Sequence, residues 1–253
     1  MSDLMLETSS TSSVPVIEIR DAVAGYGAAM ILRGLSLVIL PGEIHVLLGT
    51  NGAGKTTTLN LLLGFLKVRS GQVRVQGLDP AVEPVAARRL LAYIPENVAL
   101  YEHLSARENI AYLLDLADQP TDAQAIGDAL CAAGLDRSTH DRRVLGFSKG
   151  MRQKVAIALA LARKVSVLLL DEPTSGLDPQ AAAEFTRLMG VLRNQGVAIL
   201  MVTHDLLGAA DVADSIGFLR DGRLVEQVAA TAGPHRFDVP ALHRHYASVE
   251  MAG

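Results

Sequence analysis

Three nearly unbroken runs of apolar residues predict buried strands. They are IHVLLG at 44–49, VSVLLL at 165–170 and VAILMVTH at 197–204. Shorter strand patterns, VIEIR, LSLVIL and QVRVQG, alternate with turns over residues 16 to about 92. Between IGFLR and RLVEQ, the dipeptide Asp221-Gly222 predicts a hairpin turn. Strand-rich segments therefore lie on both sides of the middle of the chain.

The middle of the chain, from about 98 to 158, has a helical pattern instead. Ser105 with Glu108 predicts a capping box for the helix ARENIAYLLDLAD. Thr121 with Gln124 predicts a second box, for the helix DAQAIGDALCAA. We therefore predict an α/β core that is divided by an inserted helical segment.

Residues 49–56, GTNGAGKT, fit the phosphate-loop pattern G-x-x-x-x-G-K-[ST]. Glycines let consecutive backbone N–H groups approach a phosphate, and the following helix KTTTLNLLLGF favours an anion at its N-terminal end. Lys55 is expected to reach the β- and γ-phosphates, and Thr56 to ligate Mg²⁺. A glycine-rich turn before an ordinary helix is the alternative. The predicted nucleotide-binding residues of this segment are Gly49, Thr50, Asn51, Gly52, Ala53, Gly54, Lys55, Thr56 and Thr57.

The second buried strand ends on two adjacent acids, Asp171 and Glu172. Carboxylates at the end of a buried strand are costly unless a cation or a reacting water uses them. Asp171 is therefore expected to hold Mg²⁺ through water, and Glu172 to polarise the water that attacks the γ-phosphate. Two solvated acids without a function are the alternative, which the phosphate loop in the same chain disfavours.

Three further positions are ambiguous when each is taken alone. Ser148 opens SKGM and the helix RQKVAIALALARK, which by itself indicates an N-cap. Asp178 before Pro179 also has the pattern of an N-cap followed by proline at the first helical position. His204 ends the third buried strand, and a lone histidine is more often structural than functional. Its position beside the predicted catalytic carboxylates favours a functional role.

Taken in order, these segments resemble the ATP-binding subunits of ABC transporters, over most of the chain up to about residue 228. Tyr26 in AGYG resembles the aromatic residue that stacks on adenine, and a core tyrosine is the alternative. The resemblance matches Gly49–Thr56 to the Walker A motif, Ser148–Gln153 to the family signature, Asp171 and Glu172 to the end of Walker B, Ser175–Asp178 to the D-loop and His204 to the switch histidine.

The resemblance implies a fold and a mechanism. The fold is α/β, a RecA-like P-loop NTPase core with an antiparallel β subdomain and a helical subdomain at about 98–158, within an ATPase domain spanning 16–228. ATP and Mg²⁺ would be held between Lys55 of one subunit and Ser148 and Gly150 of a second copy, with Asp178 among the nucleotide-binding residues. ATP binding would close this homodimer and hydrolysis would open it. Separately encoded transmembrane permease subunits would use the movement, which implies a peripheral position at the cytoplasmic face of the membrane.

Two segments depart from the family pattern. The signature reads FSKGM where the family has LSGGQ, so Lys149 replaces a glycine and Met151 a glutamine, while Ser148 and Gly150 remain. Glu96 stands where the family usually has the Q-loop glutamine; a carboxylate can still ligate Mg²⁺ but adds negative charge beside ATP. PENVALY together with FSKGM resembles a subgroup that includes ABC-2 type exporters and the copper-processing ATPases of nitrous-oxide reductase maturation. This resemblance implies export.

Composition is consistent with such an ATPase. The chain of 253 residues is 49% hydrophobic, enough for a substantial core. Its net charge of −4 argues against a nucleic-acid partner. Cys131 is the single cysteine, so no disulfide framework forms. No stretch of eighteen apolar residues occurs, so we expect no transmembrane span.

The two ends of the sequence carry weaker patterns. Residues 1–15, rich in Ser and Thr, predict a disordered lead-in and lack the basic start and apolar core of a signal peptide. Residues 229–253 form a tail that is expected to be solvated or to pack on a partner. Its histidines, His235, His243 and His245, could suggest a metal site, but no acidic or cysteine ligands cluster near them.

Two other functional classes fit parts of the pattern. A cytosolic ABC ATPase that serves iron–sulfur assembly or DNA maintenance would share these motifs. The interval between Gly54 and Ser148 is too short for the long coiled coil of the chromosome-maintenance type. A regulator that binds nucleotide without hydrolysing it is disfavoured because Glu172 and His204 are both present. We therefore expect an ATPase that drives a membrane partner.

Overall fold

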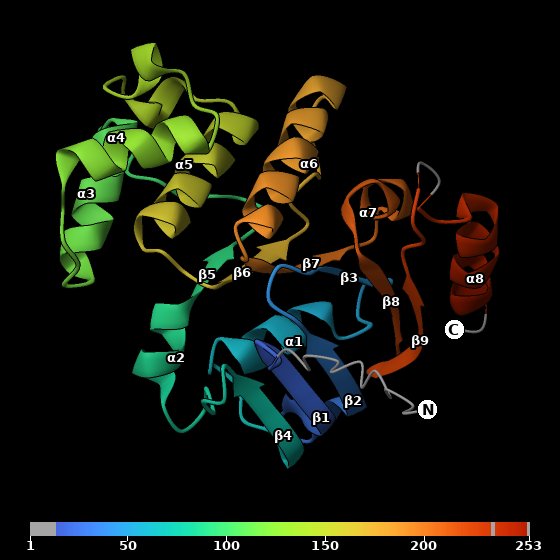
Figure 1. Cartoon of the computed structure of the whole chain (residues 1–253). Helices are drawn as coiled ribbons and strands as arrows, with labels where there is room; N and C mark the ends of the chain where they lie inside the picture. The colour runs from blue at the N-terminus through green and yellow to red at the C-terminus, as the bar shows by residue number, and fades with distance from the viewer. Residues whose placement is uncertain (1–13, 234–235, 252–253) are drawn as a thin grey trace, which may run out of the picture.

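The computed structural model describes residues 14–233 and 236–251, so residues 1–13 of the predicted lead-in and His235 of the tail lie outside the described residues. Figure 1 shows three parts: a mainly parallel sheet in the middle, a small antiparallel sheet below it and a helical arm at the upper left. This arrangement confirms the predicted fold class, an α/β ATPase core with an antiparallel β subdomain and a helical insert.

The central sheet has six strands in the order β5-β6-β7-β3-β8-β9. Their bounds are β3 Ile44–Leu48, β5 Leu91–Ile94, β6 Val167–Asp171, β7 Ala198–Thr203, β8 Ser215–Arg220 and β9 Arg223–Ala229. The three predicted buried runs form β3, β6 and β7, which are buried along nearly their whole length. β9 returns antiparallel to β8 through Asp221-Gly222, where both residues have positive φ, as the predicted hairpin turn requires.

Parallel pairing places the ends of three strands side by side. Leu48 at the end of β3 is in register with Thr203 of β7, and Asp171 at the end of β6 is in register with Val202. The segments that follow β3, β6 and β7 therefore all leave the sheet at the edge formed by the carboxyl ends of its parallel strands. This is the usual place for a ligand site in a parallel α/β sheet. This edge carries the phosphate loop and both predicted catalytic residues.

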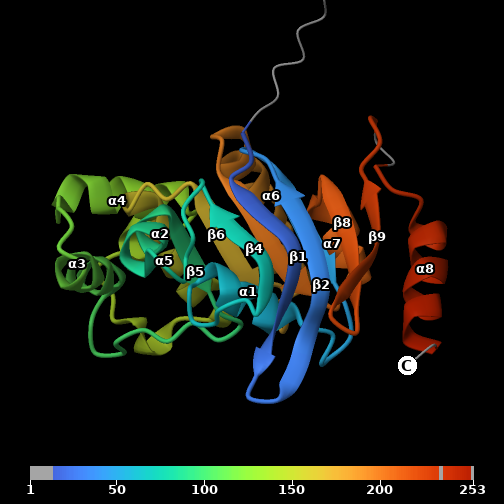
Figure 2. The ribbon, with the colours of Figure 1, turned by 90° about the horizontal axis from the view of Figure 1, so that it is seen from below.

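The antiparallel sheet lies over one face of the central sheet (Figure 2). It consists of β1 Ile17–Tyr26, β2 Ala29–Ile39 and β4 Ser70–Val75 in the order β2-β1-β4. β1 and β2 are longer than the runs that the sequence predicted, because their pairing continues past a bulge at Asp21, whose φ is 45°. The core beneath this sheet joins it to helix α1, Lys55–Leu62, and to Leu47 and Leu200 of the central strands.

Three helices form the arm: α3 Ala106–Leu116, α4 Ala123–Ala132 and α5 Lys149–Ala162. Two short 3-10 turns, η1 Arg137–Thr139 and η2 Val144–Gly146, connect α4 to α5.

Helix caps in the arm follow one prediction and correct another. The box formed by Ser105 and Glu108 before α3 is present with both of its hydrogen bonds. The second predicted box is wrong, because Asp122 and not Thr121 caps α4 and accepts from the N–H of Gln124. An Asp carboxylate is a strong N-cap, and here it satisfies the helix end one position later than predicted.

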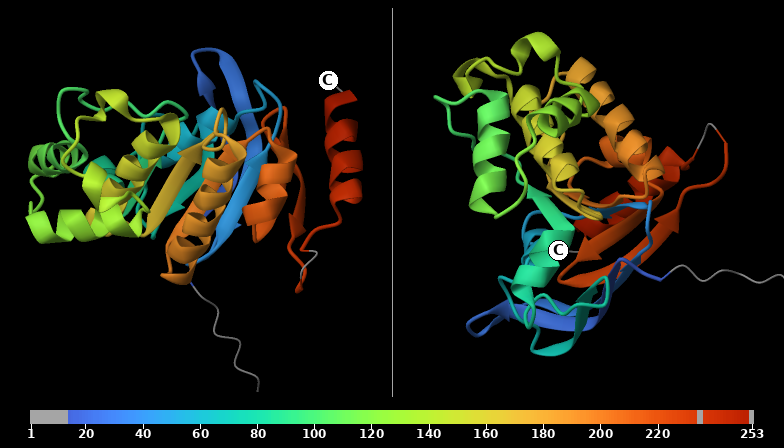
Figure 3. Two further views of the ribbon diagram at one scale, coloured as in Figure 1. Left: turned by 90° about the horizontal axis from the view of Figure 1, so that it is seen from above. Right: turned by 60° about the vertical axis from the view of Figure 1, so that its left-hand side comes forward.

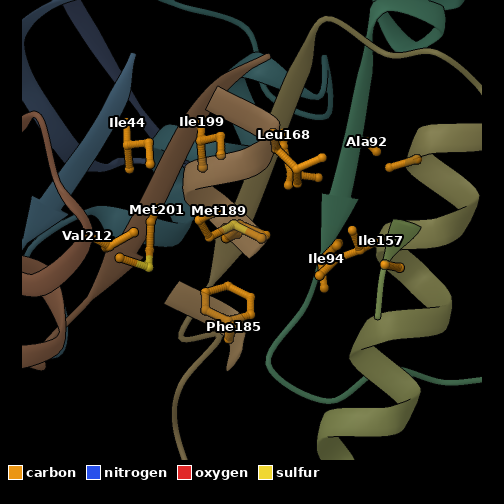
Figure 4. Packing of buried hydrophobic residues seen from close by; sticks show 14 of the residues in the cluster. Ile44, Ala92, Ile94, Ile157, Leu168, Phe185, Met189, Ile199, Met201 and Val212 are labelled. Atoms are coloured by element: carbon orange, nitrogen blue, oxygen red, sulfur yellow. The ribbon is translucent and has the colours of Figure 1, made fainter. Parts of the chain in front are cut away.

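Helices α6, Pro179–Asn194, and α7, Leu206–Val212, cover the second face of the central sheet together with α5, while α2, Pro84–Leu90, precedes β5. Figure 4 shows this core, in which Ile199 and Met201 of β7 lie near Phe185 and Met189 of α6. Packing in this core fixes α6 and the arm helix α5 against the central sheet.

The C-terminal segment packs against its own domain. Helix α8, Val239–Met251, contacts α7 and β8 beside the outer edge of the sheet (Figure 3). Phe237 and Leu242 of this segment are buried. The sequence predicts a tail that is solvated or packs on a partner. The segment packs within the chain instead, because these two apolar side chains belong to the hydrophobic core of the domain.

Within the described residues, no group of three or more His, Cys, Asp and Glu side chains could hold a metal ion. Nor does that part of the chain contain a helix with the length and apolar character needed to cross a bilayer.

His45 of β3 is a fully buried polar residue. Its Nδ1 lies 2.7 Å from Ser215 Oγ, which donates its own proton to Glu43 Oε1 at 2.8 Å. Nδ1 therefore carries the ring proton, and Nε2 has no hydrogen-bond partner. A second proton on Nε2 would be buried without an acceptor, and burial lowers the pKa of His45 to about 4.

We predict that His45 makes the protein less stable in acid. Its pKa in the folded state lies below the ordinary value of 6.5, so stabilisation that is present above pH 6.5 is lost as the pH falls toward 4. Between about pH 8 and about pH 5, the free energy of unfolding measured with urea should fall by about 2 kcal/mol because of this group. His45→Leu should lack this fall. His103→Leu, at an exposed histidine, should keep the wild-type loss. Equal losses in all three proteins would contradict the assignment.

Candidate functional site

A cavity of about 380 Å³ opens at the edge where β3, β6 and β7 end. Its lining combines the phosphate loop with the acids that follow β6. The lining residues are Tyr26, Ile31, Thr50, Asn51, Gly52, Gly54, Lys55, Thr56, Thr57, Glu96, Asp171 and Glu172. All of them except Ile31 are predicted site residues, whereas Gly49 and Ala53 belong to the loop without lining the cavity.

Glycine is required at two positions of the phosphate loop. Gly54, the N-cap of α1, has φ 113°, and a Cβ there would lie 2.7 Å from Leu32 Cδ2. At Gly49 a Cβ would lie 2.6 Å from the carbonyl oxygen of Leu219. The loop therefore packs tightly against β2 and β8 and leads into the N-terminus of α1, where unpaired N–H groups favour an anion.

Lys55 lies deep in this cavity, with 8% of its side chain exposed. Its Nζ donates to Gly49 O at 2.6 Å and to Thr50 O at 3.2 Å, and lies 3.7 Å from Glu172 Oε1. Burial lowers the pKa of Lys55, and the charges of Glu172 and Asp171 oppose that shift. The ammonium therefore lies between the phosphate loop and both acids.

Asp171 accepts a hydrogen bond at Oδ2 from Tyr93 Oη, at 3.1 Å. Burial raises the pKa of Asp171, and the bond from Tyr93 opposes the shift. Burial, together with the charge of Asp171, raises the pKa of Tyr93 to about 12. Tyr93 is thus a neutral donor that stabilises the charged form of the carboxyl group.

Glu172 is held on several sides. Thr203 Oγ1 donates to Oε2 at 2.8 Å, and the backbone N–H of His204 reaches the same oxygen at 3.3 Å. His204 Nδ1 lies 2.9 Å from Oε1, while 61% of the His204 side chain is exposed. The backbone of Glu172 has φ 45°, a left-handed conformation that is rare for a residue with a Cβ and is concentrated at functional sites. The carboxylate is thereby fixed beside Lys55.

Glu96 lies at the side of the cavity and has partners outside it. Ser175 Oγ donates to Glu96 Oε1 at 2.9 Å, and Lys149 Nζ lies 3.6 Å from the same oxygen. The predicted Q-loop residue is therefore next to the nucleotide cavity and is joined to both the D-loop and the signature segment.

Ser148, Gly150 and Asp178 line a different cleft, of about 270 Å³, between α5 and α6. Ser148 accepts from the N–H of Met151 at 3.3 Å and Asp178 from that of Ala181 at 2.8 Å, so both are helix N-caps, as predicted. The predicted nucleotide-binding residues thus form two separate groups within one copy of the chain.

Sequence reasoning missed three hydroxyl groups that contact the carboxylates, those of Tyr93, Thr203 and Ser175. Tyr93 and Thr203 lie on strands that end at the same edge as the acids, so the strand pattern carried a signal for them. The contacts of Ser175 and Lys149 with Glu96 join distant segments and have no local signal.

The chemistry of the cavity fits a magnesium nucleotide. The loop supplies backbone donors and Lys55 supplies a cation, as phosphates require. Thr56, Asp171 and Glu96 offer the hydroxyl and carboxylate oxygens that Mg²⁺ prefers. Tyr26 is 50% exposed, and its hydroxyl accepts a hydrogen bond from Asn60 Nδ2 at 2.7 Å, which suits a ring that stacks on a base.

The sequence matches the ABC transporter family over residues 32–175, which is more than half of the chain. YdbJ of Bacillus subtilis (strain 168), an uncharacterized ABC transporter ATP-binding protein, is 32% identical over 216 residues, covering 85% of this chain and 70% of that protein. The bacitracin transport ATP-binding protein BcrA of Bacillus licheniformis is 34% identical, with coverages of 84% and 69%. The spermidine/putrescine import ATP-binding protein PotA of Mesoplasma florum is 35% identical, with coverages of 83% and 60%.

Solved structures agree with this match. An ATP-binding subunit of an ABC transporter is 31% identical with a TM-score of 0.75, covering 92% of this chain and 94% of that chain. MJ0796, a bacterial ABC transporter cassette with a dimeric structure, is 25% identical with a TM-score of 0.71, covering 84% and 98%. The chain described here therefore belongs to the ABC transporter family, as an ATP-binding subunit.

Proposed function

We propose that this chain binds Mg-ATP in the cavity at the ends of β3, β6 and β7, and that Glu172 activates the water that attacks the γ-phosphate. The chain is an ATP-hydrolysing subunit of an ABC transporter, and ATP hydrolysis energises transport in this family. The observation that carries the residue assignment is the carboxylate of Glu172, held by Thr203 and His204 at 3.7 Å from Lys55.

Lys55 holds the β- and γ-phosphates. Its ammonium donates to two loop carbonyls and pairs with Glu172, and a phosphate oxygen is a charged and therefore stronger acceptor than a carbonyl. Thr56, Asp171 and Glu96 would hold Mg²⁺, which would neutralise charge on the phosphates. Tyr26 stacks on the adenine.

Glu172 accepts the proton of the attacking water as the water oxygen bonds to phosphorus. For this role the carboxylate has to keep one position, and its bonds to Thr203 and His204 provide that. His204 orients Glu172 through Nδ1, and its exposed ring is available to the γ-phosphate.

A second copy of the chain completes the site. Ser148, Gly150 and Asp178 line a cleft apart from the phosphate loop, so we infer that they contact the nucleotide held by the other copy. The dimeric structure of the similar MJ0796 cassette supports this inference. ATP binding then closes the dimer and hydrolysis opens it, which moves the transmembrane subunits.

The membrane partner in this proposal is a separately encoded permease that exports its substrate, with the ATPase at the cytoplasmic face. The residues of FSKGM and PENVALY support export. One matching relative is named for bacitracin transport and another for spermidine/putrescine import, so the proposal of export rests on those residues. ATP-dependent uptake by inverted membrane vesicles that contain the co-purified permease would support export, and its absence alongside uptake by right-side-out vesicles would contradict it.

The first prediction concerns Glu172. Glu172→Gln should keep Mg-ATP binding but reduce turnover by about 10²–10⁴-fold, because an amide of the same size cannot accept the proton. Light scattering should detect a dimer that accumulates with ATP. Glu18→Gln on β1, which removes a carboxylate paired with Arg20, is the matched control and should hydrolyse ATP normally. Near-normal hydrolysis by the Glu172 variant would contradict the assignment.

The second prediction separates the two groups of site residues. Lys55→Ala should weaken binding of Mg-ATP by roughly tenfold or more, since it removes a charged hydrogen-bond donor to phosphate. Ser148→Arg should leave binding to one copy intact but block dimer closure, because its contact is made across the interface. Calorimetry and light scattering measure the two effects. Loss of binding in both variants would show that a two-copy site is wrong.

A further inference from the structure

The two departures from the family pattern contact each other. Lys149, in place of the signature glycine, has its Nζ 3.6 Å from Oε1 of Glu96, in place of the Q-loop glutamine. Ser175 Oγ donates to the same oxygen at 2.9 Å. The side chains of Lys149 and Glu96 are 27% and 45% exposed, so solvent screens the pair only in part.

Charge in the nucleotide cavity explains why this pair matters. Three carboxylates line the cavity, those of Glu96, Asp171 and Glu172, and Lys55 is the one cation among its lining residues, all of which lie in the described part of the chain. Lys55 interacts with Asp171 and Glu172. The charge of Glu96 is balanced from outside the lining, by Lys149.

We propose that Lys149 is a positioning residue for nucleotide binding, which holds the Glu96 carboxylate beside Ser175 and neutralises its charge so that the cavity accepts a triphosphate anion. The inference rests on the proposed Mg-ATP site and assigns to it a cation that the same copy supplies. Without Lys149, the carboxylate of Glu96, which lines the cavity, would carry an unbalanced negative charge beside the phosphates and would repel them.

The position of the Lys149 ammonium is set by its surroundings. Lys149 is the first residue of α5, and one turn later Gln153 Nε2 donates to Pro173 O at 2.5 Å, which ties this end of α5 to the segment after β6. A Cβ on Gly176 of that segment would lie 3.9 Å from Lys149 Nζ. The D-loop therefore lies against the ammonium and keeps it near Glu96.

A matched control lies in the helical arm. Arg107 of α3 pairs with Asp141 at 3.0 Å, and the two side chains are 32% and 75% exposed. Neither residue lines the nucleotide cavity or the cleft between α5 and α6. Loss of this pair removes a partly exposed ion pair without changing the charge beside the phosphates of either copy.

The experiment compares Lys149→Met, Glu96→Gln, the double variant and Arg107→Met. Isothermal calorimetry measures binding of a non-hydrolysable imido analogue of ATP, with Mg²⁺ and with a chelator in its place, and thermal unfolding checks that each variant is folded. Lys149→Met should weaken binding by about threefold to fivefold with Mg²⁺, the scale of a half-exposed ion pair. The loss should be larger without Mg²⁺, because no divalent cation then offsets the charge of Glu96. In the Glu96→Gln background, the same substitution should change the affinity little.

Four results would overturn the inference. Unchanged affinity in Lys149→Met, or an equal loss with Glu and with Gln at position 96, would overturn it. A loss of the same size in Arg107→Met would also overturn it, since any partly exposed ion pair would then have the same effect. If the wild-type protein failed to bind the analogue at all, the proposed nucleotide site itself would be wrong, and this inference with it.

Discussion

The parallel register of β3, β6 and β7 is the constraint on which the rest of the site depends. It brings the end of β3, with its phosphate loop, to the same edge as Asp171 and Thr203. Nearly continuous burial of these strands fixes the register, because a shift would move their ends relative to one another and to the packed layers on both faces. Lys55 and Glu172, far apart in the sequence, approach within 3.7 Å only as a result.

Within that frame, each carboxylate of the cavity has a partner of its own. Tyr93 donates to Asp171, Glu172 is held by Thr203 and His204 beside Lys55, and Glu96 is paired with Lys149. Partly buried charges need such partners, since desolvation otherwise favours their neutral forms. The proposed magnesium nucleotide site needs the same groups charged, so the contacts that stabilise the protein would also prepare the cavity for phosphate and a divalent cation.

Local patterns predicted much of this arrangement, and long-range contacts account for what they missed. The buried strands, the phosphate loop and the caps at Ser148 and Asp178 follow from residues adjacent in sequence. The cap of α4 was misplaced by one residue because two neighbouring side chains could both serve the helix end. The pairing of Lys149 with Glu96 depends on how α5 packs against the core, which no sequence window contains. The docking of α8 on α7 likewise depends on a surface formed elsewhere in the chain.

The central claim is that each nucleotide is held by Lys55 of one copy and Ser148 of another. Mixing subunits that carry Lys55→Ala with subunits that carry Ser148→Arg tests it directly, because a mixed dimer contains one site with both residues intact. The account predicts that the mixture hydrolyses ATP, whereas neither variant does so alone. Absence of any recovery, with both variants folded and mixed dimers demonstrated by mass spectrometry, would contradict it.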